Sequence, residues 1–176
     1  MGGGRLSVQI FRVVVVLLCL DFAGCARIVA KYDAFYSLTL NKFSEDTAKF
    51  LAAAEAGKQE RLYTSKETVT FYAAGYNTFD RLSQRAALDR GMIRCSTNAQ
   101  LKVLADNIAN ASRLPDDYLS FDCLEFQLFA TRLLFDDLKS AHETGGVLTR
   151  GEARAYGVPL QVAILGAIRT FDLTRP

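Results

Sequence analysis

Residues 118–144 read YLSFDCLEFQLFATRLLFDDLKSAHET, and they form the most apolar of the segments that have helical spacing. One set of positions recurs every three or four residues, which places the side chains on one face of an α-helix: Leu124, Leu128, Thr131, Phe135 and Leu138. A second apolar set points away from this face by roughly a third of a turn or more: Phe126, Phe129 and Leu133. Because two faces are apolar, this helix needs cover on two sides.

Helical spacing also extends over the segments on both sides of this stretch. Four further helices are predicted, over residues 28–57, 62–91, 96–112 and 149–171. Gly57 and the pair Gly145-Gly146 mark helix ends, the pattern Thr149-x-x-Glu152 has the spacing of a capping box, and Pro159 predicts a kink in the last helix. No useful length of chain alternates with the period of a strand. The predicted fold class is therefore all-α, an up-and-down four-helix bundle with one additional short helix.

Length, composition and charge limit the number of domains and the class of partner that the chain can bind. The chain has 176 residues, of which 50% are hydrophobic and 23% are charged, so it can form one domain with a sizeable core. Basic and acidic residues number 21 and 19 and are spread along the chain. This balance lacks the basic footprint of a nucleic-acid-binding protein. Twelve Phe and seven Tyr, with no Trp, predict a core rich in aromatic rings.

The first residues have the layout of an export signal. Arg5 and Arg12 precede an apolar run of eight residues at 13–20, which is shorter than the roughly 18 residues that a membrane-spanning helix needs. The small residues Ala23 and Gly24 then stand directly before Cys25. A positive start, a short apolar run and a small-residue cleavage site are typical of a secretory signal peptide. Residues 1–24 are therefore predicted to be removed, and residues 25–176 to form the single helical-bundle domain.

The tetrapeptide Phe22-Ala23-Gly24-Cys25 resembles the lipobox of bacterial lipoproteins. The resemblance implies that Cys25 becomes the first residue and carries a diacylglyceryl group, with a third chain such as palmitate on its amine. Two or more acyl chains are enough for stable anchoring. Ala26 implies the outer membrane, with the domain facing the periplasm. The lipobox family prefers Leu where this chain has Phe22, and the alternative is ordinary cleavage near Ala26 without lipidation.

Two cysteines remain for the folded domain. Cys19 lies in the signal peptide and Cys25 at the processing site, which leaves Cys95 and Cys123. In an oxidising periplasm we expect these two to form a disulfide that closes a loop of about 29 residues, a stabilisation of roughly 3.5 kcal/mol. Two buried free thiols are an alternative. A metal site is a weaker one, because structural zinc needs four ligands and no histidine lies near these cysteines.

Residue types for catalysis are few. The single histidine, His142, has Lys139 three residues before it, whereas a di-iron bundle requires a glutamate there. One histidine without a nucleophile pattern also gives no Ser/His/Asp or Cys/His group. His142 continues the helix face of Leu128, Phe135 and Leu138, and we expect it to neutralise the negative end of its helix dipole. The acidic residues fit a helix start or solvated faces better than a catalytic carboxylate pair: Asp116, Asp117, Asp122, Glu125, Asp136, Asp137 and Glu143. The sequence therefore predicts no enzyme, no cofactor and no metal site.

The aromatic surplus leaves three interpretations. It forms the core, or an interaction surface around Phe126, Phe129 and Leu133, or a slot between helices for an apolar ligand. The sequence predicts a lipid-anchored periplasmic protein with a non-enzymatic structural or interaction role in the envelope. Its expected partners are the membrane and an envelope protein, with a second copy of the chain as another option. The alternative function is a carrier or sensor of a small hydrophobic ligand.

Overall fold

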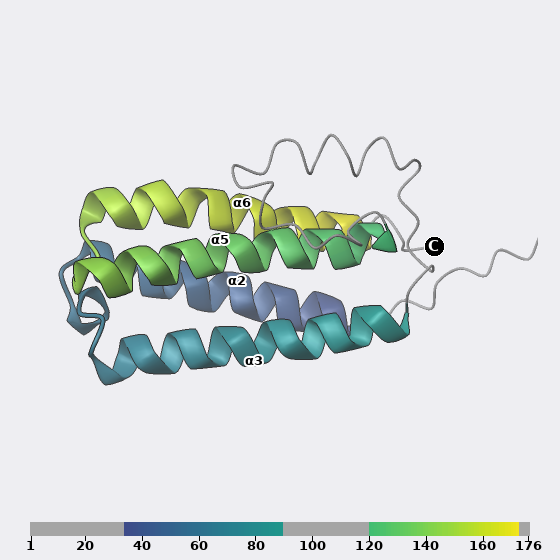
Figure 1. Ribbon diagram of the computed structural model, residues 1–176, viewed down its shortest axis with the longest axis horizontal. Helices are drawn as coiled ribbons and strands as arrows, with labels where there is room; N and C mark the ends of the chain where they lie inside the picture. The colour runs from purple at the N-terminus through teal and green to yellow at the C-terminus, as the bar shows by residue number, and fades with distance from the viewer. Residues whose placement is uncertain (1–33, 90–119, 173–176) are drawn as a thin grey trace, which may run out of the picture.

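The computed structural model describes residues 34–89 and 120–172. These ranges form four α-helices and one 3-10 turn: α2 (Ala34–Glu55), η1 (Gln59–Arg61), α3 (Lys66–Leu88), α5 (Cys123–Gly145) and α6 (Arg150–Asp172). Consecutive helices run in opposite directions and pack side by side (Figure 1). The prediction of an all-α four-helix bundle is confirmed. The short helix expected at 96–112 lies outside the described residues.

The end of α2 follows from a glycine that adopts the left-handed conformation. Gly57 has a φ of +77°, and its amide donates to the carbonyl of Ala54, while the amide of Lys58 donates to Ala53. These two bonds make a Schellman motif, which satisfies carbonyls that the helix itself leaves without donors. The predicted stop at Gly57 is confirmed.

The beginning of α5 differs from the prediction by a few residues. The expected start was near position 118, but the helix begins at Cys123 because Asp122 caps it. The Asp122 carboxylate accepts from the amide of Glu125 at 2.9 Å, and the Glu125 carboxylate accepts from the amide of Asp122 at 3.1 Å. This reciprocal pair is a capping box that the sequence pattern Asp-x-x-Glu already contained.

The last helix begins where the sequence predicted. The carboxylate of Glu152 accepts from the amide of Thr149 at 2.9 Å, and the Thr149 hydroxyl accepts from the amide of Glu152 at 3.2 Å. The helix then runs unbroken through Pro159 to Asp172. Pro159 is exposed, and the Ala155 carbonyl that loses its donor also belongs to an exposed residue, where water can replace the missing bond.

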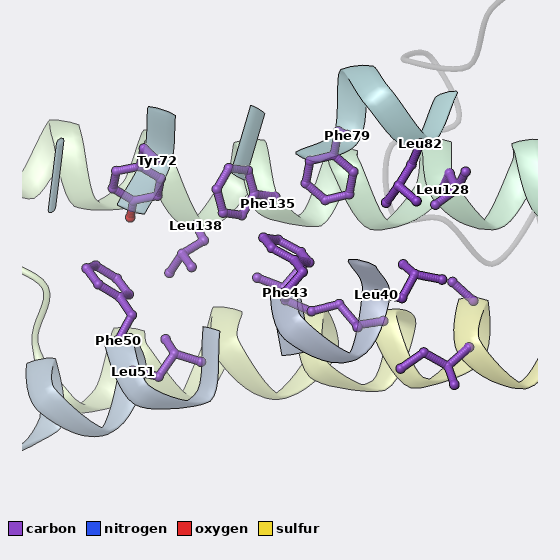
Figure 2. Close-up of a cluster of buried hydrophobic side chains, with 14 of the residues drawn as sticks. Leu40, Phe43, Phe50, Leu51, Tyr72, Phe79, Leu82, Leu128, Phe135 and Leu138 are labelled. Atoms are coloured by element: carbon purple, nitrogen blue, oxygen red, sulfur yellow. The ribbon is translucent and has the colours of Figure 1, made fainter. Parts of the chain in front are cut away.

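The core consists of two layers with different side chains. Rings from α2, α3 and α5 fill the space beside α3: Phe43, Phe50, Tyr72, Phe79 and Phe135 (Figure 2). Phe71 is partly buried and packs against them. Aliphatic and small side chains fill the space beside α6: Leu40, Leu51, Ala153, Leu160, Ile164 and Ala167. The aromatic core that composition predicted is therefore concentrated on one side of the bundle. Among the described residues, no helix combines the length and apolarity needed to cross a bilayer.

Candidate functional site

The two connections at one end of the bundle are joined by hydrogen bonds. Residues Leu62 and Val147 form an isolated antiparallel bridge between the α2–α3 connection and the α5–α6 connection. The amide of Tyr63 donates to Gly146 at 3.1 Å, and the amide of Leu148 donates to Arg61 at 2.8 Å. Thr68 and His142, two polar residues of this end, are fully buried, and this end is the candidate site.

His142 lies at the centre of this end and is 0% exposed. Its Nε2 is 3.0 Å from the carbonyl oxygen of Arg61, and its Nδ1 is 3.1 Å from the hydroxyl of Tyr72. A carbonyl oxygen can only accept, so we assign the proton to Nε2, and Nδ1 then accepts from the Tyr72 hydroxyl. Both ring nitrogens are therefore engaged by the neutral imidazole.

Burial determines the charge of His142. It lowers the pKa of the imidazole below its ordinary value, and the bond to Arg61 opposes this shift only in part. His142 is therefore neutral at pH 7. The prediction that His142 neutralises the helix dipole is wrong, because a neutral ring carries no charge to do so. The prediction that it continues the buried stripe of Phe135 and Leu138 is confirmed.

Aromatic rings enclose the imidazole on several sides. Tyr63, Tyr72 and Phe50 have ring centroids 5.4, 5.9 and 6.2 Å from that of His142. Burial also raises the pKa of the Tyr72 phenol, so that this hydroxyl stays protonated as a donor. The hydrogen bonds of His142 to Tyr72 and to the Arg61 carbonyl join α3 and the α2–α3 connection to the end of α5.

The surface next to this network is hollowed. A cavity of about 720 Å³ is lined by residues 57–62 together with Glu67 and Val147. Charges of both signs surround it, from Lys58, Arg61, Glu60 and Glu67. A shallow, charge-balanced hollow of this kind differs from the apolar pockets that hold small hydrophobic ligands. Within residues 34–89 and 120–172 no group of His, Cys, Asp and Glu side chains is arranged to hold a metal ion.

The predicted cysteine sites are only partly within the described residues. Cys25 and Cys95 lie outside them. Cys123, the first residue of α5, is disulfide-bonded. The pairing of Cys123 with Cys95 and the lipidation of Cys25 stay predictions.

The candidate interaction surface on α5 is largely covered. Phe126 and Leu133 are buried, although neither belongs to the core cluster of the four helices, and Phe129 is half-buried. The ring of Phe129 lies 6.0 Å from that of Phe121 in an edge-on arrangement. The two-sided cover expected for this helix is thus present at Phe126 and Leu133, and these side chains do not form an open surface. Contact of these residues with a partner protein stays a prediction.

Sequence reasoning missed the network around His142. The available signal was a histidine on an apolar stripe, which needs polar partners once it is buried. One partner of His142, Tyr72, lies on the facing stripe of another helix. The other partner is the backbone carbonyl of Arg61, whose position cannot be predicted from residue types. Comparison of the chain with protein-family models, with curated proteins and with solved structures found no match.

Proposed function

We propose that this chain is a lipid-anchored protein of the bacterial envelope that acts through contacts with another envelope protein and catalyses no reaction. The observation that carries the proposal is the sequence Phe22-Ala23-Gly24-Cys25 directly after a short apolar run. Eight residues separate Cys25 from α2, so the bundle would begin close to the anchor. Ala26 favours the outer membrane, with the bundle in the periplasm.

Three features of the bundle support export and a role without catalysis. A disulfide at Cys123 is typical of proteins from oxidising compartments. The only histidine has both ring nitrogens in internal hydrogen bonds. A hollow next to it is lined by charged side chains of both signs, a polarity that the rim of a protein interface commonly has.

Fatty-acid labelling tests the anchor. The full chain is expressed in a bacterium with a lipoprotein pathway and grown with labelled palmitate. We expect the wild-type chain to incorporate label and the Cys25→Ser variant to lose it, because the acyl chains are attached at that sulfur and its amine. Cys19→Ser is the matched control, since Cys19 lies in the same segment and should be irrelevant to lipidation. Label retained by Cys25→Ser would refute the anchor.

Purification from solubilised membranes tests the interaction. We expect one other envelope protein to elute with the chain in constant ratio. A small apolar molecule extracted from the purified protein, with no protein partner, would favour the carrier alternative instead. Elution of a lone, ligand-free chain would contradict both functions.

A further inference from the structure

One face of α6 is exposed along its whole length. Its residues are spaced by three and four, so that they fall within about a third of the helix circumference. They are Arg150, Arg154, Val158, Val162, Leu165 and Arg169, and all six are exposed. We call this set the α6 outer face. Its middle is apolar and both of its ends are cationic.

The positive charge of the α6 outer face is largely uncompensated within the described residues. Arg154 pairs with the Glu55 carboxylate at 3.3 Å, and Arg150 reaches only the Glu55 backbone carbonyl at 3.5 Å. Among the side chains that the structure describes, which end at Phe171, Arg169 has no carboxylate partner. Glu152 lies on another side of α6, where Thr149 engages it.

The neighbouring surface of α2 is charge-balanced by contrast. Lys42 pairs with Asp46 at 3.1 Å, and Lys49 pairs with Glu45 at 2.6 Å. The excess of positive charge is therefore a property of α6 rather than of this whole side of the bundle. An apolar strip with arginines at its ends is complementary to an anionic lipid surface, which offers phosphates above an acyl boundary.

The position of α6 relative to the N-terminal segment suits this partner. The ring of Tyr36, near the start of α2, lies 5.0 Å from the ring of Phe171, near the end of α6. The C-terminal part of the α6 outer face therefore lies at the bundle end where α2 begins. The eight residues between Cys25 and Ala34 can reach about 30 Å when extended. A bundle held by Cys25 could thus lay α6, about 35 Å long, along the bilayer.

We propose that the α6 outer face lies on the headgroup region of an anionic bilayer, with Val158, Val162 and Leu165 at the acyl boundary and the arginines on lipid phosphates. This goes beyond the proposed function, which requires an anchor but no contact between bundle and lipid. Its argument on reach rests on the anchor at Cys25. The charge contribution should weaken with added salt, because exposed charges are screened.

Tryptophan fluorescence tests the proposal, because the chain has no Trp of its own. Val162→Trp places a reporter on the α6 outer face, where Val162 is 63% exposed. Val69→Trp is the matched control on α3, where Val69 is 57% exposed. Figure 1 shows α3 and α6 on opposite sides of the bundle. Each mature, acylated variant is reconstituted into vesicles of phosphatidylcholine with or without phosphatidylglycerol, and part of the lipid carries bromine in its acyl chains.

We expect brominated lipid to quench Val162→Trp about twofold or more over Val69→Trp in the anionic vesicles, since bromine quenches only rings near the acyl boundary. The difference should shrink in pure phosphatidylcholine and in high salt. Adding Arg150→Glu and Arg169→Glu to the Val162→Trp chain should abolish it. Helix content from circular dichroism verifies that each variant is folded.

Three outcomes would overturn the proposal. One is equal quenching of the two reporters in anionic vesicles. Another is quenching of Val162→Trp that stays the same whatever the lipid charge or the salt concentration. The third is a blue shift of Val162→Trp in detergent that grows with protein concentration, which would mean that a second copy covers this face. Palmitate content, measured on the same preparations, reports the anchor separately, so that failure of the anchor and failure of the α6 contact are distinct results.

Discussion

The two sides of the bundle core are built in different ways. Beside α3, Phe135 is surrounded by rings, with centroids of Phe43, Phe71 and Phe79 at 5.5 to 5.6 Å. Beside α6, most of the buried side chains are leucine, isoleucine and alanine, with the ring pair of Tyr36 and Phe171 at one end, and the backbone of α6 approaches α2 and α5 more closely than α3 approaches either. The first is the aromatic layer, and the second is the aliphatic layer.

Each layer has one glycine that allows a close contact. In the aromatic layer, a Cβ on Gly75 would stand 2.2 Å from Cζ of Phe135. In the aliphatic layer, a Cβ on Gly157 would stand 2.6 Å from a terminal methyl of Leu51. This difference indicates that the large rings keep α3 farther from its neighbours, and that the Phe135 ring fits against α3 only because Gly75 has no side chain. Beside α6, smaller side chains allow close packing along the length of the helix. A substitution among the rigid rings of the aromatic layer should therefore lower stability more than a matched substitution in the aliphatic layer.

The largest effect is expected from Phe135→Ala, which removes the central ring of the aromatic layer. The free energy of unfolding should fall by about 3–5 kcal/mol, because the neighbouring rings cannot collapse into the space. Leu160→Ala is the matched change in the aliphatic layer and should cost about 2–4 kcal/mol. Urea unfolding of both variants measures the difference. A larger loss for Leu160→Ala would break the comparison.

Gly75→Ala should come next. The new methyl group would overlap the Phe135 ring, and overpacking of this kind costs about 1–3 kcal/mol after relaxation. Gly157→Ala is the matched change, and there the Leu51 methyls can rotate away while alanine adds about 1 kcal/mol of helix propensity. We expect a change within about 1 kcal/mol for Gly157→Ala. Equal destabilisation of the two variants would show that both layers are equally rigid.

The third effect is a pH dependence at the loop end of the aromatic layer. Burial lowers the folded-state pKa of His142, so the unfolded chain binds its proton first as the pH falls. Stability from neutral His142 is thus complete above about pH 6.5 and is lost as the pH drops toward the folded-state pKa, by at most about 1.4 kcal/mol per pH unit.

His142→Gln should remove this dependence between about pH 5 and 6.5, because the chain has no other histidine. Tyr72→Phe should lower stability at every pH in that range and keep the slope, since the imidazole remains buried without its donor. Thermal unfolding across the range provides the measurement. If the stability of His142→Gln still changed with pH as in the wild type, groups other than His142 would be responsible for the pH dependence.

The smallest expected effect is a gain. Thr47 is fully buried on α2, and helical spacing places it between the Phe43 side that faces the aromatic layer and the Leu51 side that faces the aliphatic layer. Its hydroxyl has no hydrogen-bond partner. Thr47→Val keeps the shape and removes the unpaired group, so the midpoint of urea unfolding should rise by the equivalent of about 1 kcal/mol. A loss of stability would point to a polar contact at this boundary.

The order of the described helices and most of their ends followed from the sequence because apolar spacing, glycine stops and the Thr149–Glu152 box are local signals. The helix predicted from position 62 begins at Lys66, because Ser65 caps it. The start of α5 was placed a few residues early because Asp122 competed with other acidic residues that suit a helix start equally well. The division of the core into two layers was not predictable from each helix alone. It depends on which stripe faces which, and that is decided by packing between segments far apart in the chain.

The candidate site was harder to predict for a related reason. The charge of His142 depends on Tyr72 and on the carbonyl of Arg61, which are 70 and 81 residues away. Helical spacing placed His142 on a buried stripe but gave no information about these partners. Cys123 could be assigned to a disulfide from compartment and parity, since both are properties of the whole chain.

The carbonyl of Arg61 accepts two hydrogen bonds, from the amide of Leu148 and from His142. It therefore links the turn of the α2–α3 hairpin to both the helix and the turn of the α5–α6 hairpin. Neither hairpin can open at this end without breaking a hydrogen bond to the other, so the two should melt as one cooperative unit. Protonation of the His142 ring would leave its bond to the Arg61 carbonyl in place and would remove the Nδ1 acceptor of the Tyr72 hydroxyl, so it would loosen the contact between α3 and α5 rather than the link between the two turns.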